Sequence, residues 1–264
     1  MARLKISGLL LSAGLLVAAS TPAVSASRPE STIWMKVEPA AIGVDLFYKG
    51  ASVHVEGVIP AGYDAAILCG GQEGSIELKR KGKVAGFLWM NVAEVVFEDV
   101  PSLYLLSTSG ALAKLAPPPV LEELGVGYPA LESRALRSPA RTLQGGDFRE
   151  FLKLKESERL YSFDAGGLEF EPRPDGAMQV SAEFWLPTKA PWGEYEVRLF
   201  GFKAGRGELL RTARLQLGPV GVTARVSALA TRHGLLYGVL AVLVALGVGL
   251  LTGLVFGLAS KKGH

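Results

Sequence analysis

Few side chains in this 264-residue chain are of the types that bind metals or perform catalysis, and those few are scattered. The three histidines, His54, His233 and His264, are far apart in the sequence, whereas a metal site needs clustered ligands. His54 alternates with apolar residues on the same side as Ser52 and Glu56, which favours an exposed surface histidine over a ligand. We therefore expect no metal-binding or cofactor-binding residue.

Side chains for nucleophilic and acid–base catalysis are equally sparse. There is no Gly-x-Ser-x-Gly turn to present a nucleophilic serine. Cys69 is the one cysteine, and its place at the end of an apolar run is typical of a buried, unreactive thiol. Glu94, Glu98 and Asp99 could meet in space, although charges at strand edges explain them more simply. An enzyme would need a concave pocket with two or more carboxylates of raised pKa; we expect no catalytic residue and a non-enzymatic protein.

The longest apolar segment runs from Leu235 to Ala259 without an ionisable side chain. As a helix rising about 1.5 Å per residue, it is long enough to cross a hydrocarbon core about 30 Å thick. Lys261 and Lys262 follow it at once. We predict a juxtamembrane segment and one transmembrane helix in residues 225–260, and a cytoplasmic tail in residues 261–264.

Three glycines of the predicted span are spaced four residues apart: Gly249, Gly253 and Gly257. This spacing places them on one helix face, where a second backbone could approach closely. Glycine is also common in membrane spans generally, so the alternative is that these glycines have no role in helix packing. We favour a helix-packing face that contacts another transmembrane helix within the lipid bilayer, either of a membrane protein subunit or of a second copy.

The amino-terminal residues 1–26 have the three parts of a signal peptide. Arg3 and Lys5 precede an apolar centre, and small residues suited to cleavage end at Ala26. An uncleaved anchor is the alternative, but the apolar run is short for a span. Export of the body of the chain and the lysines after the span give the same topology by the positive-inside rule. The main domain is thus expected outside the cytoplasm and the carboxyl terminus inside.

The formal charge of +3 shrinks once residues 1–26 are removed. They hold two basic and no acidic residues, which leaves 28 − 2 = 26 basic against 25 acidic residues. A nearly neutral domain gives no reason to expect nucleic acid as a partner. The one basic cluster, Lys79-Arg80-Lys81 with Lys83, is interpreted as a solvated hairpin tip; a contact with lipid headgroups or an acidic partner is the alternative.

The exported part has the two-residue alternation of strands with one buried face. Residues 27–110 contain about seven short runs punctuated by glycine and proline, which predicts an antiparallel, immunoglobulin-like β-sandwich in a mainly β protein. Residues 164–224 form a second β-rich part, with a hairpin signal at Asp175-Gly176. This part could complete the first sandwich, but we lean to a separate module next to the membrane.

A helical connector is predicted between the two β-rich parts, in residues 111–163. Within it, Asp147 is the expected N-cap of a helix, since Glu150 follows at the spacing of a capping box. Phe148 and Phe151 then fall on one helix face, which we expect to lie against a sheet.

Two tryptophans lie on strand faces opposite the aliphatic residues. Trp34 alternates with Ile33 and Met35, and Trp185 with Phe184 and Leu186. A large aromatic side chain on an outer face covers a second layer or anchors a partner. We favour packing between domains, with a partner surface at Trp34 and Trp185 as the alternative.

Several segments together resemble the Alph_Pro_TM family of bacterial transmembrane proteins, which have a signal peptide, an exported domain and one carboxy-terminal span. In chain order they are Phe87–Val92, Phe97–Tyr104, Gly193–Val197 and Leu235–Gly238 at the entry to the glycine-bearing span. One departure is that Leu250 follows Gly249, where members often have tryptophan. The resemblance implies the bacterial inner membrane and a periplasmic domain, and the family has no assigned activity to carry over.

The resemblance also implies a role, because we associate this family with permeases of the sulfite/organosulfonate-exporter type. The first hypothesis is an accessory subunit of such a transporter or of a respiratory complex. The second is a stand-alone periplasmic sensing or small-ligand-binding module, with a pocket between its two β-rich parts. The glycine face favours the first hypothesis.

Overall fold

A computed structural model of the chain describes residues 33–84, 87–137 and 146–260. The predicted signal peptide and cytoplasmic tail lie outside these residues. The strands are β1 (Met35–Glu38), β2 (Ala41–Val44), β3 (Ala51–Ile59), β4 (Asp64–Gly70), β5 (Glu73–Val84), β6 (Leu88–Pro101), β7 (Tyr104–Thr108), β8 (Tyr161–Ala165), β9 (Glu169–Pro172), β10 (Met178–Leu186), β11 (Gly193–Lys203) and β12 (Arg206–Pro219). The helices are α1 (Leu112–Leu115), α2 (Pro118–Leu124), α3 (Tyr128–Arg137), α4 (Asp147–Ser157), α5 (Gly221–Arg232) and α6 (Gly234–Ser260).

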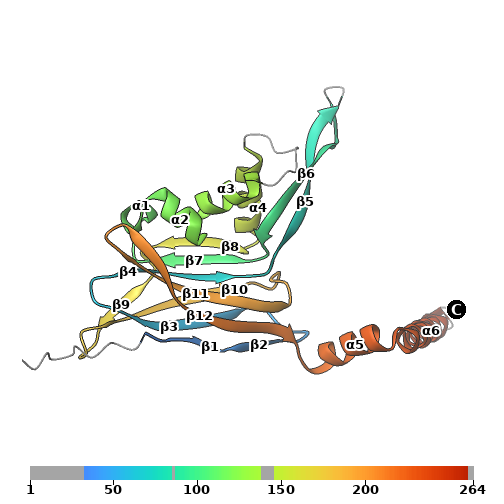
Figure 1. Cartoon of the computed structure of the whole chain (residues 1–264). Helices are drawn as coiled ribbons and strands as arrows, with labels where there is room; N and C mark the ends of the chain where they lie inside the picture. The colour runs from blue at the N-terminus through green and yellow to red at the C-terminus, as the bar shows by residue number, and fades with distance from the viewer. Residues whose placement is uncertain (1–32, 85–86, 138–145, 261–264) are drawn as a thin grey trace, which may run out of the picture. The chain divides into compact units, whose positions relative to one another are not determined.

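Two sheets pack face to face and confirm the predicted mainly β, immunoglobulin-like sandwich (Figure 1). One sheet has the strand order β1-β3-β10-β9, and the other has the order β2-β12-β11-β4-β7-β8. Most neighbours are antiparallel, as expected, but β2 pairs with β12 and β7 with β8 in parallel. A third, two-stranded sheet is the β5–β6 hairpin.

The two β-rich parts of the sequence share both sheets, so the separate membrane-proximal module is wrong. Strand β10 pairs with β3 along its whole length, from Met178 opposite Ile59 to Leu186 opposite Ala51. In the other sheet, β11 pairs with β4. The physical reason is that β3 and β4 lie inside their sheets, where each backbone needs hydrogen-bond partners on two sides. The second part supplies those partners.

The core lies where the inner faces of the two sheets meet. Val53 and Val55 of β3 are fully buried, as are Val197 and Leu199 of β11. Gly57 of β3 lets the sheets approach, because a Cβ atom added there would lie 2.9 Å from the Leu199 Cδ2 atom. Such interdigitation at native packing density is what holds a sandwich together.

Cys69 faces this core from β4 and is fully buried, as its apolar context predicted. Burial raises the pKa of its thiol to about 12. A buried, protonated thiol is a poor nucleophile, so the structure supports its interpretation as a packing residue.

Helices cover the outer face of the second sheet and replace the predicted connector with a packed layer (Figure 1). Because of this cover, every residue of β7 is buried. Tyr104 of β7 fixes the layer: its hydroxyl donates a hydrogen bond to the Gly125 carbonyl at 3.1 Å and accepts one from the Gly127 N–H at 2.7 Å. The turn between α2 and α3 is therefore bonded directly to the sheet.

Helix α4 packs as predicted but begins one residue earlier than expected, at Asp147 itself. Gly146 is the N-cap, with a φ of 106° that glycine adopts readily, and Asp147 lies in the first turn instead. Phe148 and Phe151 are buried, and the Phe151 ring stacks on that of Phe97 with centroids 4.6 Å apart. The helix thereby holds the base of the β5–β6 hairpin.

The basic cluster lies toward the end of the β5–β6 hairpin, but within a paired strand and not between two strands as predicted. Lys79, Lys81 and Lys83 lie within strand β5, and Gly82 pairs with Met90 inside the hairpin. The strand continues because cross-strand pairing with β6 runs through the cluster, from Lys79 opposite Glu94 to Val84 opposite Leu88. The cluster is thus the side of a long hairpin and not its turn.

Replacing Phe97 by alanine is predicted to lower the free energy of unfolding by about 3–5 kcal/mol, because a buried ring is lost and a cavity remains. Chemical denaturation of the full chain in detergent measures this change. Phe87→Ala is the matched control: its side chain is 80% exposed, so we expect a change within about 0.5 kcal/mol. Equal effects of the two substitutions would contradict the hairpin arrangement.

Alkaline pH is predicted to unfold the domain, because burial raises the pKa of Tyr104, Tyr161 and Tyr195. Their protonated forms stabilise the fold fully below the unfolded pKa of about 10, and this contribution is lost as pH rises above it. The loss is about 1.4 kcal/mol per pH unit for each tyrosine. Tyrosinate absorbance and circular dichroism should change together, and Tyr161→Phe should make the pH dependence shallower. Ionisation of these tyrosines in the folded chain would refute the prediction.

Candidate functional site

Helix α6 is the candidate membrane span. Its segment Gly234–Gly253 is long and apolar enough to cross a bilayer, and none of it is buried by the rest of the described chain. Gly249 and Gly253 lie four residues apart, and no described atom lies within 4 Å of where a Cβ atom would stand at either position. Gly257 continues the row within the same helix. The face is therefore open, and its packing partner stays a prediction.

The one hydroxyl near this face is satisfied within the helix. Thr252 Oγ1 donates a hydrogen bond to the Val248 carbonyl at 2.8 Å. In hydrocarbon an unsatisfied polar group would cost several kcal/mol, so this bond removes a reason to seek a polar partner. Contact at this face would rest on close backbone packing.

The structure does not bring Trp34 and Trp185 together. The Trp34 carbonyl accepts a hydrogen bond from Val58 N–H at 2.9 Å, whereas Trp185 stands opposite Ser52. These two β3 positions are six residues, or about 20 Å, apart along the strand. The two tryptophans thus belong to different places on the domain surface and form no common patch.

Trp185 covers a loop of its own domain. A Cβ atom added to Gly50 would lie 2.5 Å from the Cζ2 atom of the Trp185 ring, and the Gly50 φ of 108° favours glycine independently. Since both β-rich parts form one domain, this contact is not packing between domains. The side chain is still 47% exposed, which leaves the predicted partner surface at Trp185 untested.

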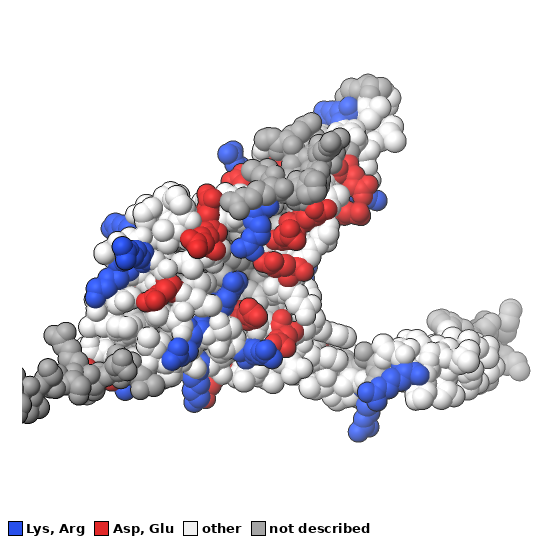
Figure 2. Space-filling model, viewed as in Figure 1, with Lys and Arg blue, Asp and Glu red and all other residues white. Residues whose placement is uncertain are grey.

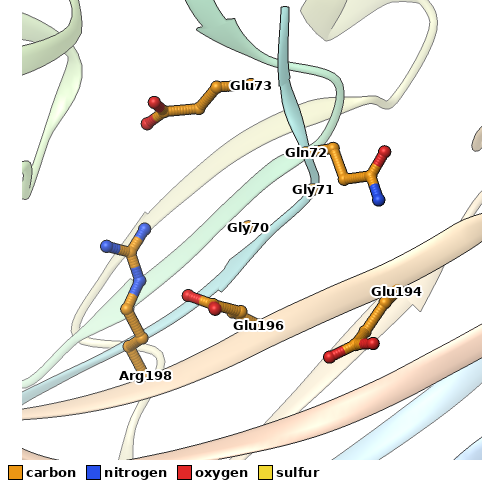
Figure 3. Close-up of a pocket in the computed structure, with 7 residues that line it drawn as sticks. All are labelled: Gly70, Gly71, Gln72, Glu73, Glu194, Glu196 and Arg198. Carbon is orange, nitrogen blue, oxygen red and sulfur yellow. The ribbon is translucent and has the colours of Figure 1, made fainter.

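A polar groove of about 700 Å³ lies at the ends of β4 and β11 (Figure 3). Glu196 and Arg198 project into it from β11, and Glu73 projects to it from the start of β5. Glu194, Gln72, Gly70 and Gly71 complete its lining. Sequence reasoning missed this groove because its two sides come from segments more than 100 residues apart. The only signal was the polar alternation of Glu194, Glu196 and Arg198 along β11.

Charges of both signs meet in this groove. The Glu73 carboxylate pairs with Arg134 of α3, and the Glu194 Oε1 atom lies 2.9 Å from the Nε atom of Arg214. The Arg198 guanidinium lies 6.0 Å from the centre of the Phe200 ring, and its buried Nε atom has no hydrogen-bond partner in the described part of the chain. An arginine with an unused donor can bind an anionic group.

The groove is lined by carboxylate, guanidinium and amide side chains and by two glycines. Its lining includes no histidine, cysteine or serine in the residues that the structure describes. In those same residues, no cluster of three side chains suited to a metal ion occurs. His54 lies elsewhere, on β3, with its Nε2 atom 3.1 Å from Glu56.

Comparisons with known proteins give one family. The family model described as "Putative transmembrane protein (Alph_Pro_TM)" matches residues 32–257. No curated protein matches the chain. A solved structure titled "BspA_C_WT" is similar at 10% sequence identity and a TM-score of 0.20, with 70% of this chain and 50% of that chain covered. The chain thus spans half the length of that structure, and a TM-score of this size carries no argument.

Proposed function

This chain belongs to the Alph_Pro_TM family of transmembrane proteins, and from that premise we propose that it is a non-enzymatic accessory subunit of a larger membrane complex. It is a membrane protein in contact with the lipid bilayer, with a β-rich domain and one possible span, α6. The observation that carries the proposal is the open glycine face at Gly249 and Gly253.

Physical chemistry explains why such a face suits a partner helix. Lipid tails are as apolar as leucine, so helices associate in a bilayer through close van der Waals packing and not through the hydrophobic effect. A row of glycines removes the side chains that would keep two backbones apart. Gly247 also lies in α6, but at 100° per residue it points about 120° away from Gly253. It therefore lies outside this face.

Family resemblance and topology support the choice of partner. We place the domain in the periplasm, the span in the bacterial inner membrane and the carboxyl terminus in the cytoplasm, since Lys261 and Lys262 follow the span. The partner is a multi-span permease of the sulfite/organosulfonate-exporter type or a subunit of a respiratory complex. A neighbour of this kind offers several helices for the glycine face.

Gly253→Leu is predicted to reduce recovery of the partner about tenfold, which corresponds to about 1.4 kcal/mol of association free energy. The measurement is affinity purification of the tagged full chain from native membranes in mild detergent, followed by quantitative mass spectrometry. Gly247→Leu is the matched control, because it adds the same side chain on another helix face, and it should leave recovery unchanged.

Each result of this purification decides between proposals. A multi-span protein in constant ratio, lost only with Gly253→Leu, supports the accessory role. Recovery of the chain alone, or equal losses with both variants, contradicts it. A homodimer sensitive only to Gly253→Leu assigns the face to a second copy.

The polar groove favours a second candidate function, a periplasmic module that binds a small solute. The positively charged guanidinium of Arg198 would bind an anionic group, and Glu196 beside it would bind an ammonium group. The ligand class is then a small zwitterion, such as an amino acid or an aminosulfonate.

Calorimetric titration of the full chain with such zwitterions tests this candidate. Arg198→Gln is predicted to weaken binding about tenfold or more, because a charge-assisted hydrogen bond contributes about 1.5–3 kcal/mol. Arg206→Gln is the control, since that arginine is exposed on β12 and does not line the groove. Absence of heat with any zwitterion, or equal losses with both variants, would count against the sensing module.

A further inference from the structure

The far end of the β5–β6 hairpin exposes large apolar side chains to solvent. We define the hairpin tip as Lys81–Val84 of β5 together with Phe87–Val92. Its exposed large apolar residues are Val84, Phe87, Leu88, Trp89, Met90 and Val92. The Phe87 and Trp89 side chains are 80% and 63% exposed. A contiguous apolar surface of this kind marks an interaction site in a soluble domain.

The hairpin tip is amphipathic, because paired residues of a hairpin project to the same face. One face carries the pairs Val84–Leu88 and Gly82–Met90, and it is apolar. The other face carries the pairs Lys83–Trp89 and Lys81–Asn91, and it is basic with one indole. The Lys83 Nζ atom lies 5.4 Å from the centre of the Trp89 ring, so the cation and the aromatic ring form one unit.

Burial changes abruptly along the hairpin. At its base, Val95, Phe97 and Val100 are buried in the core of the domain. The hairpin tip gains nothing from that core, and an isolated two-stranded ribbon is at best marginally stable in water. Its apolar residues are therefore not required for folding of the sandwich, and they are free for a contact outside it.

Charge is also divided along the hairpin. Lys81 and Lys83 lie toward the tip, Lys79 pairs with Glu94 below them, and the acidic residues Glu77 and Glu98 lie closer to the base. Figure 2 shows basic and uncharged surface near the end of the hairpin, with acidic side chains gathered below it. This polarity attracts the tip to an anionic surface and repels the base from it.

We propose that the hairpin tip inserts into the lipid bilayer that holds the chain's own span, on the side of the β-rich domain. The apolar face enters the boundary between headgroups and acyl chains, and Lys81 and Lys83 bind anionic headgroups. Trp89 suits this depth, since indole rings favour the membrane interface. Lysines extend their charged ends to the headgroups while their methylene groups stay in apolar surroundings.

Charge complementarity and tethering both favour lipid as the occupant. Each lysine near an anionic lipid surface raises the equilibrium constant for membrane binding about fivefold. The span keeps the domain beside a bilayer at high effective concentration, so even weak insertion is populated. The inference needs only the domain and the span, and not the accessory role proposed above.

A fluorescent probe on the hairpin tip in proteoliposomes tests the proposal. Met90→Cys in the full chain accepts an environment-sensitive NBD label, while buried Cys69 is protected from it. The vesicles contain phosphatidylcholine and phosphatidylglycerol, with or without lipids that carry a quencher on the acyl chain. We expect blue-shifted emission that these lipids quench. Leu209→Cys is the matched control, because its β12 position has the same 49% exposure as Met90 and should report water.

Variants separate the apolar and electrostatic parts of the contact. Leu88→Glu should abolish the blue shift. Lys81→Gln with Lys83→Gln should lower the ratio of inserted to free hairpin about 25-fold at low salt, fivefold for each lysine, and high salt should do the same to the unchanged chain. Circular dichroism and the denaturation midpoint of each variant show whether it folds. Gly253→Leu should leave the fluorescence unchanged, so this proposal and the accessory role fail separately.

Three results would overturn the proposal. The label at residue 90 could report water as the label at residue 209 does, which excludes insertion. The label could be shielded from water but not quenched by the modified lipids, with a shielding that depends on the protein-to-lipid ratio. This result assigns the hairpin tip to a second copy. It could be shielded only in native membranes and not in pure lipid, which assigns it to another membrane protein.

Discussion

Pairing between strands that are far apart in the sequence is the constraint on which the whole domain depends. Strand β3 pairs with β10, and β4 pairs with β11, so each sheet is closed by segments more than 100 residues apart. Such contacts cost loop-closure entropy before the burial of apolar surface offsets that cost, and they slow folding. The helical layer relies on contacts that are closer in the sequence, because the Tyr104 hydroxyl bonds the α2–α3 turn to β7. Everything exposed at the surface is held in place by this core.

Once that core is formed, large apolar surfaces remain in two described places. One is the Gly234–Gly253 segment of α6, which is strongly apolar and unburied. The other is the hairpin tip, where Phe87 and Met90 face solvent. The groove at Arg198 has the opposite character, since its lining is polar and charged. The molecule thus offers apolar contacts suited to a bilayer and a polar contact suited to a solute, and these features are independent of one another.

Local sequence patterns predicted helices and strands correctly, but they did not predict which distant strands pair with each other. The uncharged run Leu235–Ala259 predicted α6 because a span is specified by length and composition alone. Alternation predicted the strands, and the apolar run before Cys69 predicted its burial. Alternation says nothing about which strand lies beside which, so the two β-rich parts were wrongly separated and the groove was missed. For the same reason Lys79–Lys83 was predicted as a hairpin tip between two strands, whereas cross-strand pairing with residues 89–94 keeps it within strand β5.

The length of the hairpin is the feature that packing leaves unexplained. Phe97 already packs the base against α4, so strands of 12 and 14 residues extend well past what the core uses. Exposed aromatic residues on such a ribbon would favour aggregation in a free soluble protein. In a chain that carries its own span, the same residues always have a bilayer within reach. Exposing the apolar surface of the hairpin tip or of the span to water is costly, and one lipid bilayer covers the apolar surface of both.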